Sequence, residues 1–350
     1  MSATGPHAAG TPEADGLTIR RATPEDEGAI IQLIRESMGP DDAVEWSAEF
    51  WRWKHERNPF GTSPVLVAED AGRLVGLRTF MRWMWTCEGR PVPAVRAVDT
   101  ATHPDYRGRG IFRRLTVRLR DEMGEEGVAM VFNTPNDKSR PGYLKMGWEV
   151  VGNPTVWVRP VRPLRAARGL LSGDGSPLAP TVRAEAAVTA LDSPGVASIV
   201  DAAGAGGVGR YHTAPTLDYL RWRYGAIPGS DYHVAVRGDG SGGALLVVKT
   251  RLRGRIRELR VCDVVANESA ESRRNARVLL RRAGRLAHVD AVIVMPTPEA
   301  RWSDLARAGY VPVPRSGPTL TVYPLDLAPG VPRPTLLNNW SSSIGAFELF

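Results

Sequence analysis

The order of hydrophobic and polar positions predicts strands that alternate with helices. Period-two alternation predicts a strand, and apolar residues three or four positions apart predict a helix. Strands are expected at 17–21, 64–69, 73–86, 92–102, 128–132 and 148–158, and helices at 24–38, 46–56, 111–125 and 139–146. This order is typical of an α/β protein of the α+β mixed-sheet kind, with helices packed on the faces of the sheet.

The second half of the chain repeats the pattern of the first. Phe50–Lys54 reappears as Tyr219–Arg223 at an offset of 169 positions, and Asp99 matches Asp263 at an offset of 164. A slowly falling offset is what small loop deletions in a duplicated domain would produce. The sequence therefore predicts two copies of one α/β unit.

Proline, glycine and polar clusters mark the expected limits of the two copies. We expect a disordered tail at 1–16, the first domain at 17–158, a linker rich in Pro, Gly and Arg at 159–181, a second domain at 182–325, and a Pro-rich tail at 326–350.

The composition of the chain limits the classes of partner and the cellular compartment that we expect. The 45 Lys and Arg residues exceed the 38 Asp and Glu residues by 7, but acidic residues are interspersed almost everywhere, so an ordinary surface explains this excess better than a nucleic-acid site. The two cysteines, Cys87 and Cys262, lack metal-type spacing and favour a reducing compartment. No apolar run of about 18 residues occurs, and the first residues do not resemble a secretory signal. We expect a cytoplasmic protein without a metal or a membrane partner.

One segment, from Asp99 to Leu115, carries the residues best suited to chemistry. A predicted strand ends there, a basic turn containing Gly108 and Gly110 follows, and an amphipathic helix begins. Glycines let the backbone approach a ligand closely, and the first turn of a helix offers unpaired N–H groups at the positive end of its dipole. Three arginines add positive charge: Arg107, Arg109 and Arg113. The segment predicts a binding site for an anion such as a pyrophosphate.

This segment resembles the acyl-CoA motif of the GNAT superfamily of N-acetyltransferases. The family pattern is Arg or Gln, two residues, Gly, one residue, and Gly or Ala. Arg107, Gly110 and Phe112 occupy its three defining positions, with Phe112 in place of the small residue.

A second family signature follows in the expected order. Asn136 precedes Tyr143 by seven residues, and Gly147-Trp148 follows Tyr143 at four residues. The resemblance covers residues 17–158 and, with the internal repeat, implies tandem GNAT-like acyl-CoA N-acyltransferase folds with a degenerate second copy.

The resemblance also implies how acetyl-CoA, the expected co-substrate, would bind. The pantetheine arm would pair with the backbone of Thr100, Ala101 and Thr102. The pyrophosphate would lie in a cradle made by Arg107, Gly108, Arg109, Gly110, Ile111, Phe112 and Arg113. Asn136 and Ser139 would contact the arm near the thiol, and Tyr143 would be the general acid for the departing thiolate. A tyrosine with an ordinary pKa near ~10 stays protonated and able to donate.

The general base is left open. Asp99 lies on the appropriate strand, but the second copy keeps Asp263 at the matching place while it loses the glycine turn, which favours a structural role for Asp99. Phe350 is a candidate through its C-terminal carboxylate, because tandem-repeat relatives, the enhanced-intracellular-survival aminoglycoside acetyltransferases, use theirs as the base. Glu69 and His103 are further candidates, and a turn-stabilising role is favoured for His103.

The matching turn of the second copy, residues 264–273, has no glycine and carries Glu268 and Glu271. Added acids repel a pyrophosphate. We expect this copy not to bind acyl-CoA and instead to shape the acceptor pocket or the domain interface.

The sequence thus predicts an enzyme that transfers an acetyl group from acetyl-CoA to a primary amine of a small molecule by direct attack. A non-catalytic sensor of coenzyme A or another nucleotide is the first alternative, and a nucleic-acid-associated protein is the second. The sequence indicates neither the acceptor nor the oligomeric state.

Overall fold

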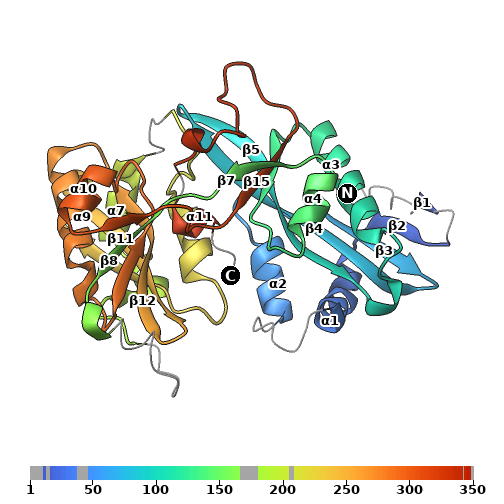
Figure 1. The fold of residues 1–350 in the computed structure, drawn as a ribbon, viewed down its shortest axis with the longest axis horizontal. Helices are drawn as coiled ribbons and strands as arrows, with labels where there is room; N and C mark the ends of the chain where they lie inside the picture. The colour runs from blue at the N-terminus through green and yellow to red at the C-terminus, as the bar shows by residue number, and fades with distance from the viewer. Residues whose placement is uncertain are drawn as a thin grey trace, which may run out of the picture. The chain divides into compact units, whose positions relative to one another are not determined.

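The structure is a computed structural model that describes residues 11–12, 16–37, 46–165, 180–204, 209–341 and 343–347. The chain forms two compact units (Figure 1). Unit 1 comprises Met1–Met84, Val92–Glu149 and Thr321–Pro329, and unit 2 comprises Trp85–Pro91, Val150–Leu320 and Gly330–Phe350. Among the described residues, no helix has the length and apolar character needed to cross a membrane.

An eight-stranded mixed sheet forms the centre of unit 1 in the described part of the chain. Its strands, in spatial order, are β1 (Thr11–Pro12), β2 (Thr18–Arg21), β3 (Val65–Asp70), β4 (Arg73–Cys87), β5 (Arg90–Thr102), β6 (Met130–Asn133), β15 (Leu320–Pro324) and β7 (Glu149–Gly152). The predicted hairpin of β3 and β4 turns at Ala71-Gly72, and β5 and β6 run parallel.

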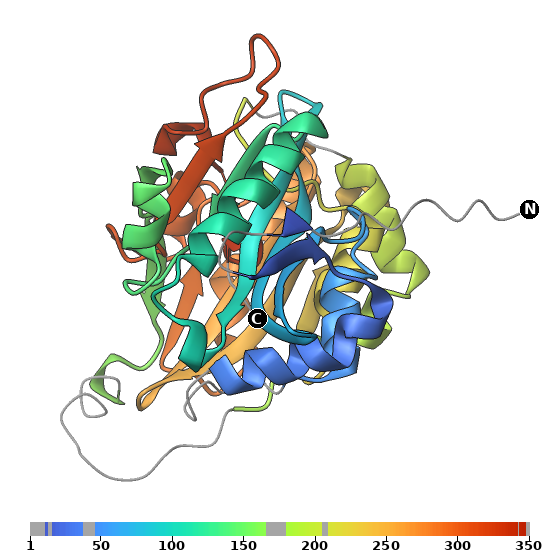
Figure 2. The same ribbon diagram turned by 90° about the vertical axis from the view of Figure 1, so that its right-hand side faces the viewer.

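Helices cover both faces of this sheet, because apolar side chains alternate to both sides of its central strands. The helical elements of unit 1 are η1 (Pro24–Asp26), α1 (Glu27–Ser37), α2 (Ala48–His55), η2 (Pro104–Tyr106), α3 (Ile111–Glu125) and α4 (Arg140–Lys145). Leu115, Leu119 and Met123 of α3 are buried against Val95 and Leu66 in one core. Figure 2 shows α3 lying along one face of the sheet.

Unit 2 repeats this arrangement around a seven-stranded sheet in its described residues. The strand order is β14 (Val311–Val313), β8 (Val156–Pro160), β13 (Ala291–Val294), β12 (Ile256–Ala266), β11 (Ala244–Arg253), β10 (His233–Arg237) and β9 (Glu185–Ala186). Its helical elements are α6 (Ala187–Ala190), α7 (Pro194–Ala203), α8 (Leu217–Leu220), the π-helical turn η3 (Arg221–Gly225), η4 (Gly240–Gly242), α9 (Ala270–Arg282), η5 (Ala283–Arg285), α10 (Trp302–Arg307), η6 (Leu337–Asn339) and α11 (Ile344–Phe347). The two sheets are consistent with tandem GNAT-like folds.

The last strand of each repeat lies in the sheet of the other repeat. β8 pairs with β13 and β14 in the second sheet, whereas β15 pairs with β6 in the first. The single strand expected at 148–158 is therefore wrong: Asn153 and Pro154 separate β7 from β8. The expected limits 17–158 and 182–325 consequently differ from the two compact units.

The segments that lead into the exchanged strands contact each other closely. The Gly317 N–H donates to the Pro154 carbonyl at 3.0 Å, and Asn153 Nδ2 donates to the Gly317 carbonyl at 3.0 Å. A Cβ on Gly317 would lie 2.6 Å from the Pro154 oxygen, so only glycine fits at this crossing.

The described residues after 329 belong to unit 2 and pack within it. Trp340 contacts the rings of Trp85 and Tyr211 at centroid distances of 5.0 and 4.9 Å, and Phe347 is 2% exposed. Aromatic side chains of this size stabilise a segment by the apolar area they bury. Most of the expected linker, and of the expected tail at 1–16, lies outside the described residues.

Candidate functional site

β5 extends beyond its neighbour at the end that carries the predicted pantetheine contacts. Among the described residues, β5 pairs with β6 only from Ala94 to Arg96, although β5 continues to Thr102. The main chain of 100–102 therefore has no strand partner on the β6 side. An extended ligand can pair with such an open edge through main-chain hydrogen bonds.

The side chains of these residues leave the edge accessible. Thr100 is exposed, and its hydroxyl donates to the Leu77 carbonyl of β4 at 3.2 Å. Ala101 is buried, and Thr102 is half-buried. The methyl group of Ala101 and the inward-bonded hydroxyl of Thr100 add no bulk at the open edge.

The turn after β5 leaves the start of α3 without a side-chain cap. Gly108 and Gly110 have φ values of +80° and +72°, in the left-handed region that glycine adopts readily. Gly110 is the N-cap residue, no side chain accepts from the first turn of α3, and no acid lies in that turn. The first amides of α3, at Ile111, Phe112 and Arg113, are thus available to an anion.

The three predicted arginines have different surroundings. Arg107 is exposed and donates to the Ser37 carbonyl at 3.2 Å. The guanidinium of Arg109 lies 4.6 Å from the ring centre of Tyr106, whose hydroxyl donates to Asp70 at 2.7 Å. Arg113 lines a separate surface cavity along α3. Positive charge therefore surrounds the turn, and the exposed side chains of Arg107 and Arg109 lie directly on it.

His103 stabilises the turn, as expected. Its Nδ1 accepts from the Asp105 N–H at 3.3 Å, and its Nε2 lies 2.7 Å from a guanidinium nitrogen of Arg73. Both ring nitrogens of His103 are thus engaged by groups of the turn and of β4, which fits a role in holding the turn.

Tyr143 of α4 packs against the first turn of α3. Its side chain is 3% exposed, and its ring contacts the rings of Phe112 and Trp148 at 5.5 and 5.4 Å. Within the described residues its hydroxyl makes no hydrogen bond. Phe112, which replaces the small residue of the family pattern, thus positions the tyrosine ring beside the glycine turn.

Asn136 and Ser139 organise the start of α4. The Asn136 Oδ1 accepts from the backbone N–H of Ser139 at 2.9 Å, from the Ser139 hydroxyl at 3.0 Å, and from the backbone N–H of Lys138 at 3.1 Å. Such an Asx-type arrangement fixes the turn that carries Tyr143. These bonds hold Asn136 and Ser139 together near the beginning of α4.

Asp99 lies in a network that favours a structural role. Its carboxylate accepts from Lys54 Nζ at 2.8 Å and from His55 Nε2 at 2.8 Å, and His55 Nδ1 lies 3.0 Å from the Ser63 hydroxyl. Asp99 also has a φ of +31°, which is uncommon for a residue other than glycine and persists where the surroundings hold it firmly.

Burial and the hydrogen bonds of the network shift the pKa values of Asp99 and His55. Burial alone would raise the pKa of Asp99, but Lys54 and His55 outweigh it and hold the pKa of Asp99 well below its usual range. Burial lowers the pKa of His55, and the hydrogen bond to Asp99 offsets this effect only in part. At neutral pH the aspartate is therefore a weak proton acceptor, and His55 is a neutral ring that donates from Nε2.

This network predicts a pH-dependent stability. Because the folded pKa of His55 lies below its ordinary 6.5, only the unfolded state gains a proton as the pH falls below that value. The free energy of unfolding should then decrease between about pH 7.5 and 5.5, as measured by denaturant titration. His55→Gln should make the decrease smaller, and an unchanged pH dependence in that variant would contradict this origin.

Lys54, His55 and Arg78 lie near the candidate site in the structure, but the sequence offered no functional reason to select them. Lys54 and His55 end α2 and reach Asp99 across 44 or more positions. Arg78 is fully buried, its guanidinium nitrogens have no hydrogen-bond partner in the described residues, and it faces the ring of Tyr143 at 5.4 Å. The available signal for Arg78 was a charged residue between the apolar positions Leu77 and Phe80 of a predicted strand.

The matching turn in unit 2 is closed by its own side chains. The Ser269 hydroxyl caps α9 by accepting from the Ser272 N–H at 3.1 Å, and the Ser272 hydroxyl accepts from the Asn267 N–H at 3.0 Å. A capped helix start offers fewer free amides to an anion. Phe350, the remaining candidate base, lies outside the described residues.

Comparisons with known proteins show what this chain is similar to. Residues 18–151 match the family model described as an acetyltransferase (GNAT) domain. No curated protein matches the chain.

Solved structures share the fold over most of the chain. A probable N-acyltransferase from Enterococcus faecalis has a TM-score of 0.60 at 12% identity, with 89% of this chain and 73% of that chain covered. A GCN5-related N-acetyltransferase from Anabaena variabilis has a TM-score of 0.58 at 14% identity, with 88% and 73% covered. Eis1 from Mycobacterium abscessus has a TM-score of 0.55 at 17% identity, with 88% and 74% covered. The chain therefore shares its fold with these GNAT proteins, and the match to the GNAT acetyltransferase domain is confined to residues 18–151.

Proposed function

We propose that this protein transfers an acetyl group from acetyl-CoA to a primary amine of a small-molecule acceptor. The observation that carries this proposal is the uncapped start of α3, which follows a left-handed glycine turn beside the open edge of β5. A diphosphate would accept from the amides of that turn, and the pantetheine arm would extend along residues 100–102. Arg107 and Arg109 would add charge at the rim.

The chemical step needs a neutral amine and a donor for the leaving group. The amine nitrogen attacks the thioester carbon, a tetrahedral oxyanion forms, and the C–S bond then breaks. Tyr143 would protonate the departing thiolate, since its hydroxyl has no competing partner in the described residues. A general acid of this kind contributes a factor of about 10²–10⁴.

The proposal gives Asp99 a structural role and assigns the removal of the amine proton to water rather than to this carboxylate. Asp99 is already bonded to Lys54 and His55, and its pKa lies below its usual range. A base works best when its pKa is near the working pH, which Asp99 does not satisfy.

The test is turnover of acetyl-CoA with a panel of primary amines, followed by thiol release and by mass spectrometry of the product. The proposal expects a product that gains one acetyl group only when amine and enzyme are both present. Binding of coenzyme A without turnover on any amine would support the sensor alternative, and strongly salt-dependent DNA binding without acetyl transfer would support the nucleic-acid alternative.

A substitution at Gly110 tests the binding of the co-substrate. Gly110→Ala should weaken acetyl-CoA binding about tenfold, because an added methyl group would stand where the diphosphate meets the backbone. Gly127→Ala is a matched control at the other end of α3: its φ is +75°, and at both positions a Cβ would meet no atom within 4 Å. Both variants carry the same backbone strain, so equal loss of affinity in calorimetry would contradict the proposal.

A further inference from the structure

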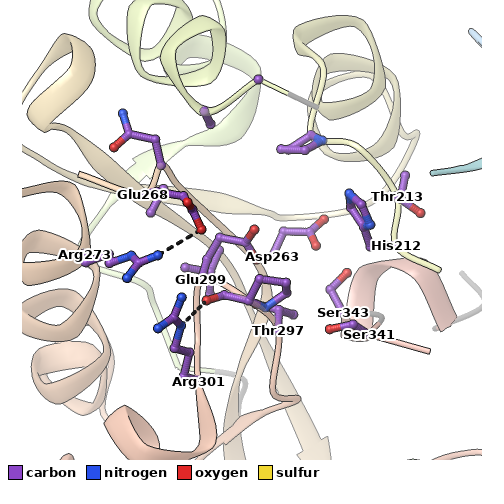
Figure 3. A pocket seen from close by; sticks show the side chains of 17 residues that line it. His212, Thr213, Asp263, Glu268, Arg273, Thr297, Glu299, Arg301, Ser341 and Ser343 are labelled. Atoms are coloured by element: carbon purple, nitrogen blue, oxygen red, sulfur yellow. Dashed lines mark hydrogen bonds and ion pairs between the residues drawn. The ribbon is translucent and has the colours of Figure 1, made fainter. Parts of the chain in front are cut away.

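Unit 2 contains a cavity of about 390 Å³, and most of the residues that line it are polar or charged (Figure 3). This volume lies near the lower end of the range for small-molecule sites. The charged or polar side chains labelled in Figure 3 are His212, Thr213, Asp263, Glu268, Arg273, Thr297, Glu299, Arg301, Ser341 and Ser343. No residue of the acyl-CoA turn in unit 1 takes part, so this cavity can be considered independently of acyl transfer.

Two carboxyl groups in the cavity lack an ion pair within the described residues. Asp263 Oδ2 accepts from the Tyr224 hydroxyl, and the Ser343 hydroxyl also bonds to this aspartate. Glu299 accepts from the Thr297 hydroxyl and from its own backbone N–H. Burial raises the pKa of both Asp263 and Glu299. Partly buried carboxyl groups without a positive partner are unfavourable when ionised.

The two arginines that line the cavity bond to groups other than Asp263 and Glu299. Arg273 forms an ion pair with Glu268 at 3.0 Å, and Arg301 Nε donates to the Pro298 carbonyl at 3.3 Å. His212 Nδ1 lies 3.0 Å from the Arg210 carbonyl, so this nitrogen is a donor, and Nε2 of a neutral ring is then an acceptor. Acceptors consequently dominate the centre of the cavity.

The aspartate of the first repeat that matches Asp263 is bonded to a lysine. Asp99 matches Asp263, and Lys54 Nζ bonds to Asp99 at 2.8 Å. In the second repeat Arg223 stands at the position of Lys54, but it donates to the Gly345 carbonyl and to the Tyr232 hydroxyl, both at 3.2 Å. Arg223 therefore acts on Asp263 through its charge, which opposes part of the pKa rise that burial causes, and not through a direct bond like the one from Lys54 to Asp99.

We propose that the unit 2 cavity binds a small organic molecule through a protonated primary amine held between Asp263 and Glu299. Ser341, Ser343 and Thr213 also line the cavity, and their hydroxyl groups suit a polar ligand. A metal ion is a poorer fit, because no group of three or more His, Cys, Asp or Glu side chains in the described residues is arranged to hold one. Ammonium–carboxylate bonds are charge-assisted and stronger than neutral ones.

Calorimetric titration of the full chain with 1,4-diaminobutane, in the absence of acetyl-CoA, tests this site. We expect saturable binding of the diamine and no binding of 1,4-butanediol, which has the same length without the charge. Asp263→Asn and Glu299→Gln should each weaken diamine binding about tenfold, because each removes one charged acceptor. Asp231→Asn, at a side chain that is 81% exposed and outside the cavity, should leave the affinity unchanged.

Three results would overturn the proposal: no binding heat up to about 10 mM diamine, equal binding of the diol, or unchanged affinity in both cavity variants. Thermal melting of each variant separates lost binding from lost folding, and Glu299→Gln keeps an acceptor for Thr297 if Asp263→Asn does not fold. Because acetyl-CoA is absent, failure here leaves acetyl transfer by unit 1 untouched, and failure of acetyl transfer leaves this binding test unaffected.

Discussion

Tyr143→Phe is expected to lower kcat for acetyl transfer about a hundredfold while the KM for acetyl-CoA changes little. The hydroxyl has no hydrogen-bond partner within the described residues, so its removal should barely alter stability. The ring contacts with Phe112 and Trp148 remain in the variant. The loss should therefore lie in the chemical step, where the thiolate needs a proton.

Tyr323→Phe is the matched control for this experiment. Tyr323 packs its ring against Trp148 at 4.9 Å, in the same core as Tyr143. It should keep wild-type kcat. Comparable loss in both variants would indicate a packing effect, and wild-type kcat in Tyr143→Phe would remove Tyr143 from the mechanism.

Asp99→Asn is expected to destabilise the protein by about 3 kcal/mol or more, because it leaves Lys54 without its counter-charge. The side chains of Lys54, His55 and Asp99 are only 5%, 2% and 9% exposed. Denaturant unfolding measures this change. Substituting Lys54 by Met in the Asp99→Asn background should recover part of the loss, because the unpaired charge is then removed.

Asp137→Asn gives a control with the same ion-pair distance and the opposite burial. Asp137 lies 2.8 Å from Arg140, but its side chain is 90% exposed, so the change in the free energy of unfolding should stay within about 0.5 kcal/mol. If Asp99→Asn were as stable as the wild type and lost acetyl transfer, Asp99 would be a catalytic group rather than a structural one.

The sequence predicted local structure well where short-range chemistry decides it. The β3–β4 hairpin and the strand–turn–helix from β5 to α3 follow from Gly72, Gly108 and Gly110 together with the hydrophobic period. The exchange of β8 and β15 did not follow, because a period-two pattern identifies a strand without specifying which sheet it joins. Pro154 was the local signal that one predicted strand was in fact two.

The candidate site depends on the sequence in the same way. The glycine turn and Tyr143 stand in recognisable spacings, so the sequence alone was enough to propose them. The pairing of Lys54 and His55 with Asp99 joins positions 44 or more apart, and no local pattern reports such a contact. Asp263 follows from the sequence only as the match of Asp99. That it lines a cavity, and that it bonds to Tyr224 rather than to a lysine, is visible only in the structure.

The most direct measurement is a crystal structure of the protein with coenzyme A. The account predicts diphosphate oxygens within hydrogen-bond distance of the backbone nitrogens of 108–113, the pantetheine arm along 100–102, and the sulfur beside the Tyr143 hydroxyl. Coenzyme A bound elsewhere on the chain, with the start of α3 empty, would contradict it.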